Sequence, residues 1–151
     1  MPQSFSSISL HLVWSTKDRR LFLHDADILA RTHAHLAKTA RDLKCRDVLV
    51  GGVADHVHLH VGLPRDLCVS DLVRDLKRSS SKSIKTMSPA LKFFAWQTGY
   101  GAFSLSLQHR PQVKAYIRGQ EEHHRTVSYQ DEFRQICRRN GVEVDEEHAW
   151  L

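Results

Sequence analysis

Residues 54–62, ADHVHLHVG, alternate histidine with aliphatic residues over most of their length. Successive side chains of a β-strand point to opposite faces, so this period of two predicts a strand over 56–63 with one apolar face. His56, His58 and His60 then share the other face. The aliphatic face belongs to a hydrophobic core, and the imidazole face needs either solvent or polar partners.

Two interpretations of the imidazole face are open at this point. Histidines at i and i+2 hold their ring nitrogens close enough to bind one cation, and neutral imidazole is a common ligand of divalent metals. The alternative is a solvent-facing side of a strand that is rich in histidine. A His-x-His spacing alone favours this alternative, so the choice depends on the rest of the chain.

A second pattern lies in VKAYIRGQEEHH, residues 113–124. On a helix, Tyr116 and Gln120 are four residues apart and point the same way, with His123 or His124 one turn further along. A tyrosine hydroxyl suits reversible attack on a phosphodiester, because the tyrosyl ester keeps the bond energy for a second transfer. With a pKa of about 10, the phenol needs a metal or a base to help it. The alternative is a core tyrosine beside a solvated glutamine.

The order of predicted elements indicates the fold class. The expected elements are a strand at 5–16, a helix at 25–43, paired strands at 47–53 and 56–63, a helix at 70–86, a strand or hairpin within 93–106, and helices at 111–125 and 128–139. This order is that of a split βαβ unit. We expect one α+β domain with a ferredoxin-like antiparallel sheet, helices on one face, and additional C-terminal helices that include Tyr116.

Charge and hydropathy limit the function classes. The 151 residues include 22 Lys plus Arg against 17 Asp plus Glu, a formal net charge of +5, which suggests a polyanionic partner. No apolar stretch approaches the roughly 20 residues of a membrane span, and the first residues lack the features of a signal peptide. We therefore expect a cytoplasmic protein with no membrane partner.

The predicted helix at 70–86 has a basic stripe opposite its apolar side. Such a stripe is usually a solvated face, but only Asp75 opposes the basic residues between positions 74 and 92, which favours phosphate contact. The candidate residues for binding a nucleic acid are Arg74, Lys77, Arg78, Lys82 and Lys85.

Three segments in this order resemble a known family: ADHVHL at 54–59, WQTGYGAFSLS at 96–106 and VKAYIRGQEEHHR at 113–125. They are similar to the small single-tyrosine transposases of the HUH nuclease superfamily. The most similar group is the insertion sequence 200/605 type, which includes transposases associated with repetitive extragenic palindromes. The similarity covers nearly the whole chain, so residues 1–151 are expected to form one HUH transposase domain.

The resemblance implies an enzyme that cleaves and rejoins single-stranded DNA at ends marked by a hairpin, with no nucleotide cofactor. Tyr116 is the implied nucleophile, which forms a 5′-phosphotyrosine and leaves a 3′-hydroxyl. His56, His58 and Gln120 are the implied ligands of one divalent ion, Mg²⁺ or Mn²⁺. This uncharged ligand set predicts modest affinity with a preference for Mn²⁺. The family commonly acts as a homodimer, and the sequence leaves open whether one subunit or two form each site.

Other assignments stay open beside this one. His60 stands where the family usually has an aliphatic residue, so His58 and His60 form a second match to the motif; we keep His56 and His58 because Asp55 precedes them as the family's turn residue does. His60, His123 and His124 are additional candidate site residues. The alternatives in function are a relative that only binds structured nucleic acid, and a metal-dependent nuclease that hydrolyses DNA with water.

Overall fold

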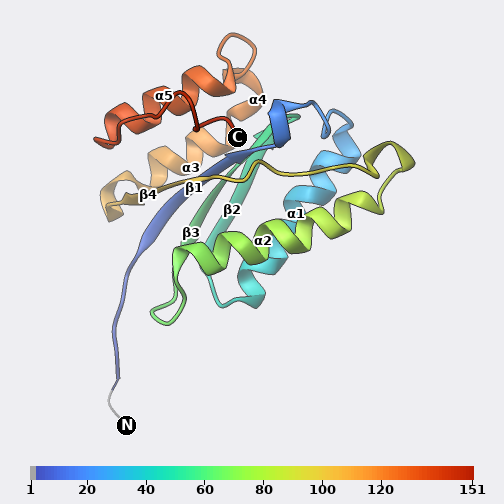
Figure 1. The fold of residues 1–151 in the computed structure, drawn as a ribbon. Coiled ribbons are helices and arrows are strands. Elements are labelled where there is room, and N and C mark those ends of the chain that lie inside the picture. Colours follow the sequence, from blue (N-terminus) through green and yellow to red (C-terminus); the bar gives the residue numbers. More distant parts are fainter. Residues whose placement is uncertain (1–2) are drawn as a thin grey trace.

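The computed structural model describes residues 3–151 and shows an antiparallel sheet between two layers of helices (Figure 1). The sheet has four strands in the order β2-β3-β1-β4. Their bounds are Ser9–Ser15 for β1, Arg46–Val53 for β2, His56–Gly62 for β3 and Gly101–Leu105 for β4. The predicted α+β, ferredoxin-like arrangement is confirmed.

The helices divide between the two faces of the sheet (Figure 1). On one face lie α1, Ala26–Asp42, and α2, Val69–Lys85. On the other lie α3, Arg110–Arg118, α4, Gln120–His123, and α5, Tyr129–Arg139. Short 3₁₀ turns are η1, Lys17–Arg19, η2, Pro89–Leu91, and η3, Leu107–His109. None of the helices within residues 3–151 is both long and apolar enough to cross a membrane.

The alternation along β3 divides its side chains as the sequence predicts. Val57, Leu59 and Val61 are fully buried in the main core, together with residues of α1 and α2 such as Leu36 and Leu72. The histidines of β3 point to the opposite face, toward α3, α4 and α5. Because β1 and β2 flank β3 on its two edges, its backbone is paired along both sides. The imidazoles therefore project from the most rigid part of the sheet.

Helix α5 begins and ends where the sequence indicates. The Ser128 hydroxyl accepts a hydrogen bond from the Asp131 amide at 3.1 Å, which caps the first turn. The Asn140 amide donates to the Ile136 and Cys137 carbonyl oxygens, and Gly141 follows with φ 69°, a conformation that glycine adopts without strain. Tyr129, Ile136 and Cys137 pack against the sheet in a second apolar cluster.

The structure differs from the predicted elements in several places. The helix expected over 111–125 divides at Gly119, whose amide bonds to the carbonyl oxygens of both Ala115 and Tyr116 and so closes the last turn of α3. Within 93–106 only Gly101–Leu105 forms a strand, while Trp96 makes an isolated bridge with Thr16. Strand β1 begins at Ser9 rather than at residue 5.

Gly51 on β2 lets α3 lie directly on the sheet. A Cβ atom built at this position would be 2.4 Å from the Ile117 carbonyl oxygen and 2.8 Å from its Cγ2 atom. Only a residue without a side chain permits this approach. The position of α3, and with it that of Tyr116, depends on this contact.

We expect Gly51→Ala to lower the free energy of unfolding by about 1–3 kcal/mol, because the added methyl group overpacks the contact with α3. Urea denaturation followed by circular dichroism measures this change. Gly99→Ala is the matched control, since the nearest atom to a Cβ there, Gln97 Nε2, is 3.7 Å away. Equal stabilities of the two variants would contradict this account of Gly51.

Candidate active site

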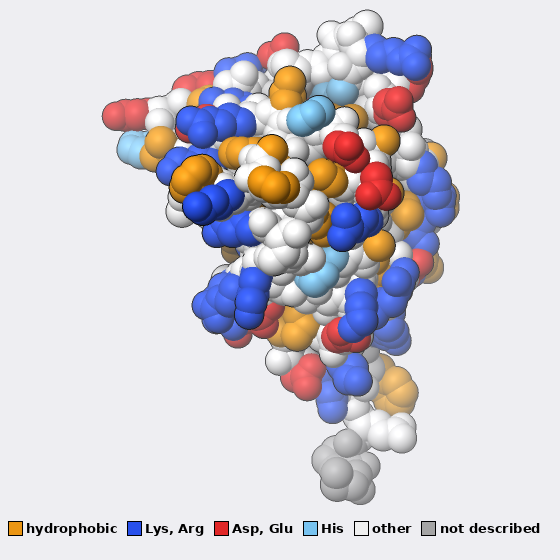
Figure 2. Space-filling view, turned by 90° about the vertical axis from the view of Figure 1, so that its right-hand side faces the viewer, with side chains coloured by type: hydrophobic (Ala, Val, Ile, Leu, Met, Phe, Trp, Pro, Cys, Tyr) orange, Lys and Arg blue, Asp and Glu red, His pale blue; other side chains and the backbone are white. Residues whose placement is uncertain are grey.

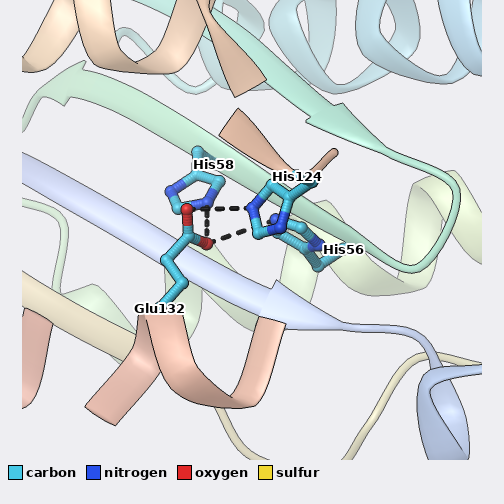
Figure 3. A group of neighbouring side chains, drawn as sticks. All are labelled: His56, His58, His124 and Glu132. Carbon is cyan, nitrogen blue, oxygen red and sulfur yellow. Dashed lines mark hydrogen bonds and ion pairs between the residues drawn. The ribbon is translucent and has the colours of Figure 1, made fainter. Parts of the chain in front are cut away.

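Side chains from β3, α5 and the segment after α4 meet between the sheet and the helices α3, α4 and α5 (Figure 3). His56 and His58 of β3 are fully buried, and Glu132 of α5 is 1% exposed. His124, which directly follows α4, lies over His56 with the two ring centroids 4.3 Å apart. Residues distant in the sequence thus form one polar cluster inside the protein.

The Glu132 carboxylate is at the centre of this cluster. Its Oε1 atom accepts from His58 Nε2 at 2.7 Å and lies 3.3 Å from His56 Nε2. Its Oε2 atom accepts from His124 Nε2 at 2.9 Å and from Gln120 Nε2 at 3.1 Å. A buried carboxylate is costly unless donors surround it, and here both oxygens are satisfied.

Tyr116 reaches the same carboxylate from α3. Its hydroxyl donates a hydrogen bond to Glu132 Oε2 and lies 3.3 Å from His123 Nε2. Gln120 also joins the cluster, because its Oε1 atom accepts from His56 Nε2 at 3.0 Å. The structure therefore brings Tyr116 and Gln120 to one carboxylate beside His56 and His58, as the family resemblance implies, although a helix break at Gly119 separates Tyr116 from Gln120.

Outer partners fix the ring orientation of the β3 histidines. His56 Nδ1 donates to Asp55 Oδ1 at 2.7 Å, and His58 Nδ1 lies 2.7 Å from His11 Nε2 on β1. Both Nε2 atoms consequently point toward Glu132. Ligand histidines of metal sites are commonly held in this way through the nitrogen that does not bind the metal.

The protonation states follow from these contacts. Burial alone would lower the pKa of His56, but its bonds to Asp55 and Glu132 raise it to about 9. Burial lowers the pKa of His58 to about 4 and that of His11 to about 3, so both are neutral near pH 7. Burial, and then the adjacent Glu132 carboxylate, raise the pKa of Tyr116 above its ordinary value. The phenol is therefore protonated at neutral pH.

The donor set fits a divalent cation. His56, His58, His124 and Glu132 each offer one atom, and these atoms all lie within 4.8 Å of one another. Neighbouring ligands about 2.1 Å from one ion are about 3 Å apart, similar to the contacts around Glu132. The Gln120 amide oxygen adds another donor beside His56. Unlike the uncharged set expected from the sequence, this set includes a carboxylate.

Accessible cavities lie on two sides of the cluster. Tyr116, His11, Phe103 and Arg139 line one of about 490 Å³, between β4, α3 and α5. Asp55 and His124 line another of about 350 Å³, whose wall also includes Arg19 and Arg125. The cavity beside Tyr116 has Arg139 in its wall and, within residues 3–151, no acidic residue, an arrangement suited to an anionic ligand, whereas Asp55 and Glu121 oppose the arginines of the second cavity.

His60 shares the β3 face but lies outside the group that can hold a cation. Its Nδ1 atom donates to the Asp47 carbonyl oxygen at 2.8 Å. Its Nε2 atom is buried and has no hydrogen-bond partner among residues 3–151. The geometry thus favours His56 and His58, rather than His58 and His60, as the pair that acts on one ion.

The predicted basic stripe lies on α2, across the sheet from the polar cluster (Figure 1). Arg78, Lys82 and Lys85 are exposed. Arg74 is also exposed and forms ion pairs with Asp71 and Asp75. Figure 2 shows Lys and Arg side chains spread over the face of the molecule that it draws, with acidic side chains between them.

Lys77 differs from the other basic residues of α2. Its ammonium group donates to the carbonyl oxygens of Gln97, Thr98 and Gly99 at 2.8, 3.2 and 2.6 Å. It also lies 5.7 Å from the ring centroid of Trp14. Lys77 therefore fixes the loop before β4 instead of projecting into solvent.

Comparison with known proteins identifies the family. A family model described as "Transposase IS200 like" matches residues 4–120, most of the chain. The chain therefore belongs to the IS200-like transposase family, a family of DNA-cleaving enzymes. The comparison with curated proteins finds no match.

Solved structures agree with this result. The chain is similar to a Deinococcus radiodurans R1 protein assigned as a transposase, with 26% identity over 80% of this chain and 95% of that chain and a TM-score of 0.65. A REP-associated tyrosine transposase bound to a REP hairpin shares the fold, with 18% identity over 84% of this chain and 74% of that one and a TM-score of 0.56.

Sequence analysis did not identify Glu132 or His11 as site residues. Glu132 is one of several acidic residues near the C-terminus, and its neighbour Asp131 is exposed. The available signal was its place on the apolar side of α5, at the spacing of Tyr129 and Ile136, which are also buried. A carboxylate among buried helix positions requires a polar partner, and the β3 histidines are the partners.

We expect His56→Ala and His58→Ala each to weaken Mn²⁺ binding by at least about 10–100-fold. Loss of an outer partner of a ligand already costs this much, and loss of a ligand itself costs more. Isothermal titration calorimetry of the purified protein measures the affinity. His60→Gln is the control and should bind Mn²⁺ like the wild type. A loss of affinity in this variant, with none in His56→Ala, would show that the ligand pair is His58 and His60.

We expect the metal-free protein to be most stable near pH 6.5. Above that pH, unfolded His56 loses its proton while folded His56 keeps it until about pH 9, so stability falls as the pH rises. Below it, His58 and His11 gain protons in the unfolded protein, whereas in the folded protein His58 stays neutral down to about pH 4 and His11 down to about pH 3. Stability therefore falls again. Urea denaturation between pH 4 and 9 in a chelating buffer tests this, and stability that rises from pH 7 to 9 would contradict it.

Proposed function

We propose that the chain is a transposase that cleaves and rejoins single-stranded DNA, with Tyr116 as the nucleophile. The observation that supports this most strongly is the Tyr116 hydroxyl beside the buried cluster that includes His56, His58 and Gln120. A nucleophile, candidate metal ligands and a cavity with Arg139 in its wall lie together. Attack by Tyr116 on the phosphorus forms a 5′-phosphotyrosine and releases a 3′-hydroxyl.

The proposed metal ligands are His56, His58 and Gln120, with Glu132 as a further oxygen donor, and the proposed ion is Mg²⁺ or Mn²⁺. Such an ion polarises the phosphate and stabilises negative charge on the leaving oxygen. Asp55 contacts Nδ1 of His56, and His11 contacts Nδ1 of His58, which holds the two ligand rings in place. His124 and His123 border the same carboxylate, and His124 is a further candidate ligand. No nucleotide cofactor takes part in the proposed reaction.

The proposed DNA substrate has a hairpin next to a single strand. A protein with this fold, the REP-associated tyrosine transposase, was solved bound to a REP hairpin. On this chain, the exposed residues Arg74, Arg78, Lys82 and Lys85 of α2 are the proposed phosphate contacts, and Lys77 is left out because its ammonium group is already bound. DNA held by α2 must pass an edge of the sheet to reach Tyr116 on the other face.

A homodimer remains part of the proposal, as a way to place DNA bound on one subunit near the nucleophile of another. It is not needed to complete the cluster, since Tyr116, Gln120 and the β3 histidines all come from one chain in this structure.

We expect a hairpin oligonucleotide with a single-stranded flank to form a covalent adduct with the wild-type protein in the presence of Mn²⁺. Tyr116→Phe should form none, because the phenol oxygen makes the bond. Denaturing gel electrophoresis with labelled DNA measures the adduct. Tyr100→Phe, which removes another hydroxyl from a half-exposed position outside the cluster, is the matched control and should react normally.

Other outcomes of this assay would replace the proposal. An adduct with Tyr116→Phe would show that the nucleophile is another residue. Cleaved DNA without linked protein would indicate hydrolysis by water. Hairpin binding without cleavage under any divalent metal would indicate a relative that only binds structured nucleic acid.

A further inference from the structure

The proposed reaction requires Tyr116 to lose a proton when it attacks. The phenol is half-buried and donates a hydrogen bond to Glu132, and a phenol with an ordinary pKa of about 10 carries its proton at neutral pH. The proton must therefore leave while the new bond forms, and a group already in contact with the hydroxyl must receive it. Glu132 and His123 are the groups that border the hydroxyl.

Of these two, Glu132 has the better geometry. The Tyr116 hydroxyl donates a hydrogen bond to Glu132 Oε2, whereas His123 Nε2 lies 3.3 Å away on a side chain that is 28% exposed. The Glu132 side chain is 1% exposed and is held by His124, Gln120 and His58. It thus stays in one place and offers a fixed acceptor.

The two oxygens of Glu132 face different groups. Oε1 is directed at the Nε2 atoms of His56 and His58, where the cation is proposed to bind. Oε2 accepts the hydrogen bond from Tyr116 and also bonds from His124 and Gln120. The Tyr116 hydroxyl thus already directs its proton at a carboxylate oxygen, and an ionised carboxylate offers only acceptor positions.

We propose that Glu132 is a catalytic residue whose Oε2 atom accepts the Tyr116 proton during attack on the DNA phosphate. This inference rests on the proposed function. The Tyr116 oxygen forms a bond to phosphorus as its proton passes to Glu132, and the bond from phosphorus to the 3′-oxygen breaks. The 3′-oxygen leaves with the electron pair of that bond and takes one proton from solvent. When the reaction reverses, Glu132 returns its proton to Tyr116.

The test combines Glu132→Gln with an acidified nucleophile. In single-turnover assays, Glu132→Gln should slow adduct formation by about 100-fold or more, because general base catalysis typically supplies that much. A fluorinated tyrosine at position 116 has a more acidic phenol, which depends less on a base. It should therefore raise the rate of adduct formation by the Glu132→Gln variant at least about tenfold. Asp131→Asn, an acid-to-amide change at an exposed neighbouring position of α5, is the matched control and should react at the wild-type rate.

Measurements other than the reaction rate exclude a merely structural role. The ¹⁹F NMR resonance of the fluorinated Tyr116 should shift between the wild-type and Glu132→Gln backgrounds, because its hydroxyl loses an ionised partner, and should not shift with Asp131→Asn. Circular dichroism and hairpin affinity establish that the slow variant is folded and binds DNA. Because Glu132 is also a proposed oxygen donor to the ion, calorimetry sets the Mn²⁺ concentration that saturates each variant, and the rates are compared at saturation. If Glu132→Gln does not fold, Glu132→Asp replaces it, since this variant keeps the charge and withdraws the oxygen from Tyr116.

The outcomes separate this inference from the proposed function. A slow variant that the fluorinated tyrosine rescues supports Glu132 as the proton acceptor. A normal rate in Glu132→Gln or Glu132→Asp, or a slow rate without rescue, overturns it while leaving Tyr116 as the nucleophile. If His123→Gln slows adduct formation and the fluorinated tyrosine rescues it, while the Glu132 variants react at the normal rate, the proton acceptor is His123. Absence of an adduct with the wild-type protein would overturn the proposed function itself.

Discussion

A single buried carboxylate connects the helical layer on one face of the sheet to its central strand. Glu132 comes from α5 and contacts β3 through His58, α3 through Tyr116 and α4 through Gln120. An isolated ionised carboxylate in a protein interior is strongly unfavourable, so its place is determined by the donors around it. The relative positions of α3, α4 and α5 therefore depend on the same group that brings the site residues together.

The sheet supplies the rigid part of this arrangement. Strand β3 is paired on both edges and has its aliphatic side chains in the main core, which holds the histidine rings in one orientation. The absence of a side chain at Gly51 lets α3 approach closely enough for its tyrosine to reach the histidine cluster. Apolar packing therefore holds one face of β3, and the polar contacts of its histidines hold the other face.

The sheet separates the buried polar cluster from the exposed basic helix α2. The polar cluster lies between the sheet and α3, α4 and α5, where His56, His58 and Glu132 are buried, and charge interactions between buried groups are stronger than at the surface. The Arg and Lys residues of α2 lie on the other face of the sheet, where they are exposed. The buried polar cluster and the exposed basic residues of α2 therefore lie on opposite faces of the sheet.

Local patterns predicted much of the fold. The period of two in 54–62 placed His56 and His58 on one face, and the order of strands and helices predicted the split βαβ topology that the structure has. The spacing of Tyr116 and Gln120 predicted that they point the same way from one helix, and both contact Glu132, although the break at Gly119 was not foreseen. These features depend on residues close in the sequence or on side chains within one element, and periodicity reports such relations directly.

The sequence by itself determined which faces of the elements are apolar, the order in which the elements follow one another, and the motif residues His56, His58, Tyr116 and Gln120. Only the tertiary structure decided that Glu132 and His11 join them, that His60 does not, and that Lys77 is occupied by the loop before β4. The reason is that contacts such as that between Glu132 and His58 join separate elements, so they depend on how a helix packs against a sheet. No spacing within either element encodes that packing.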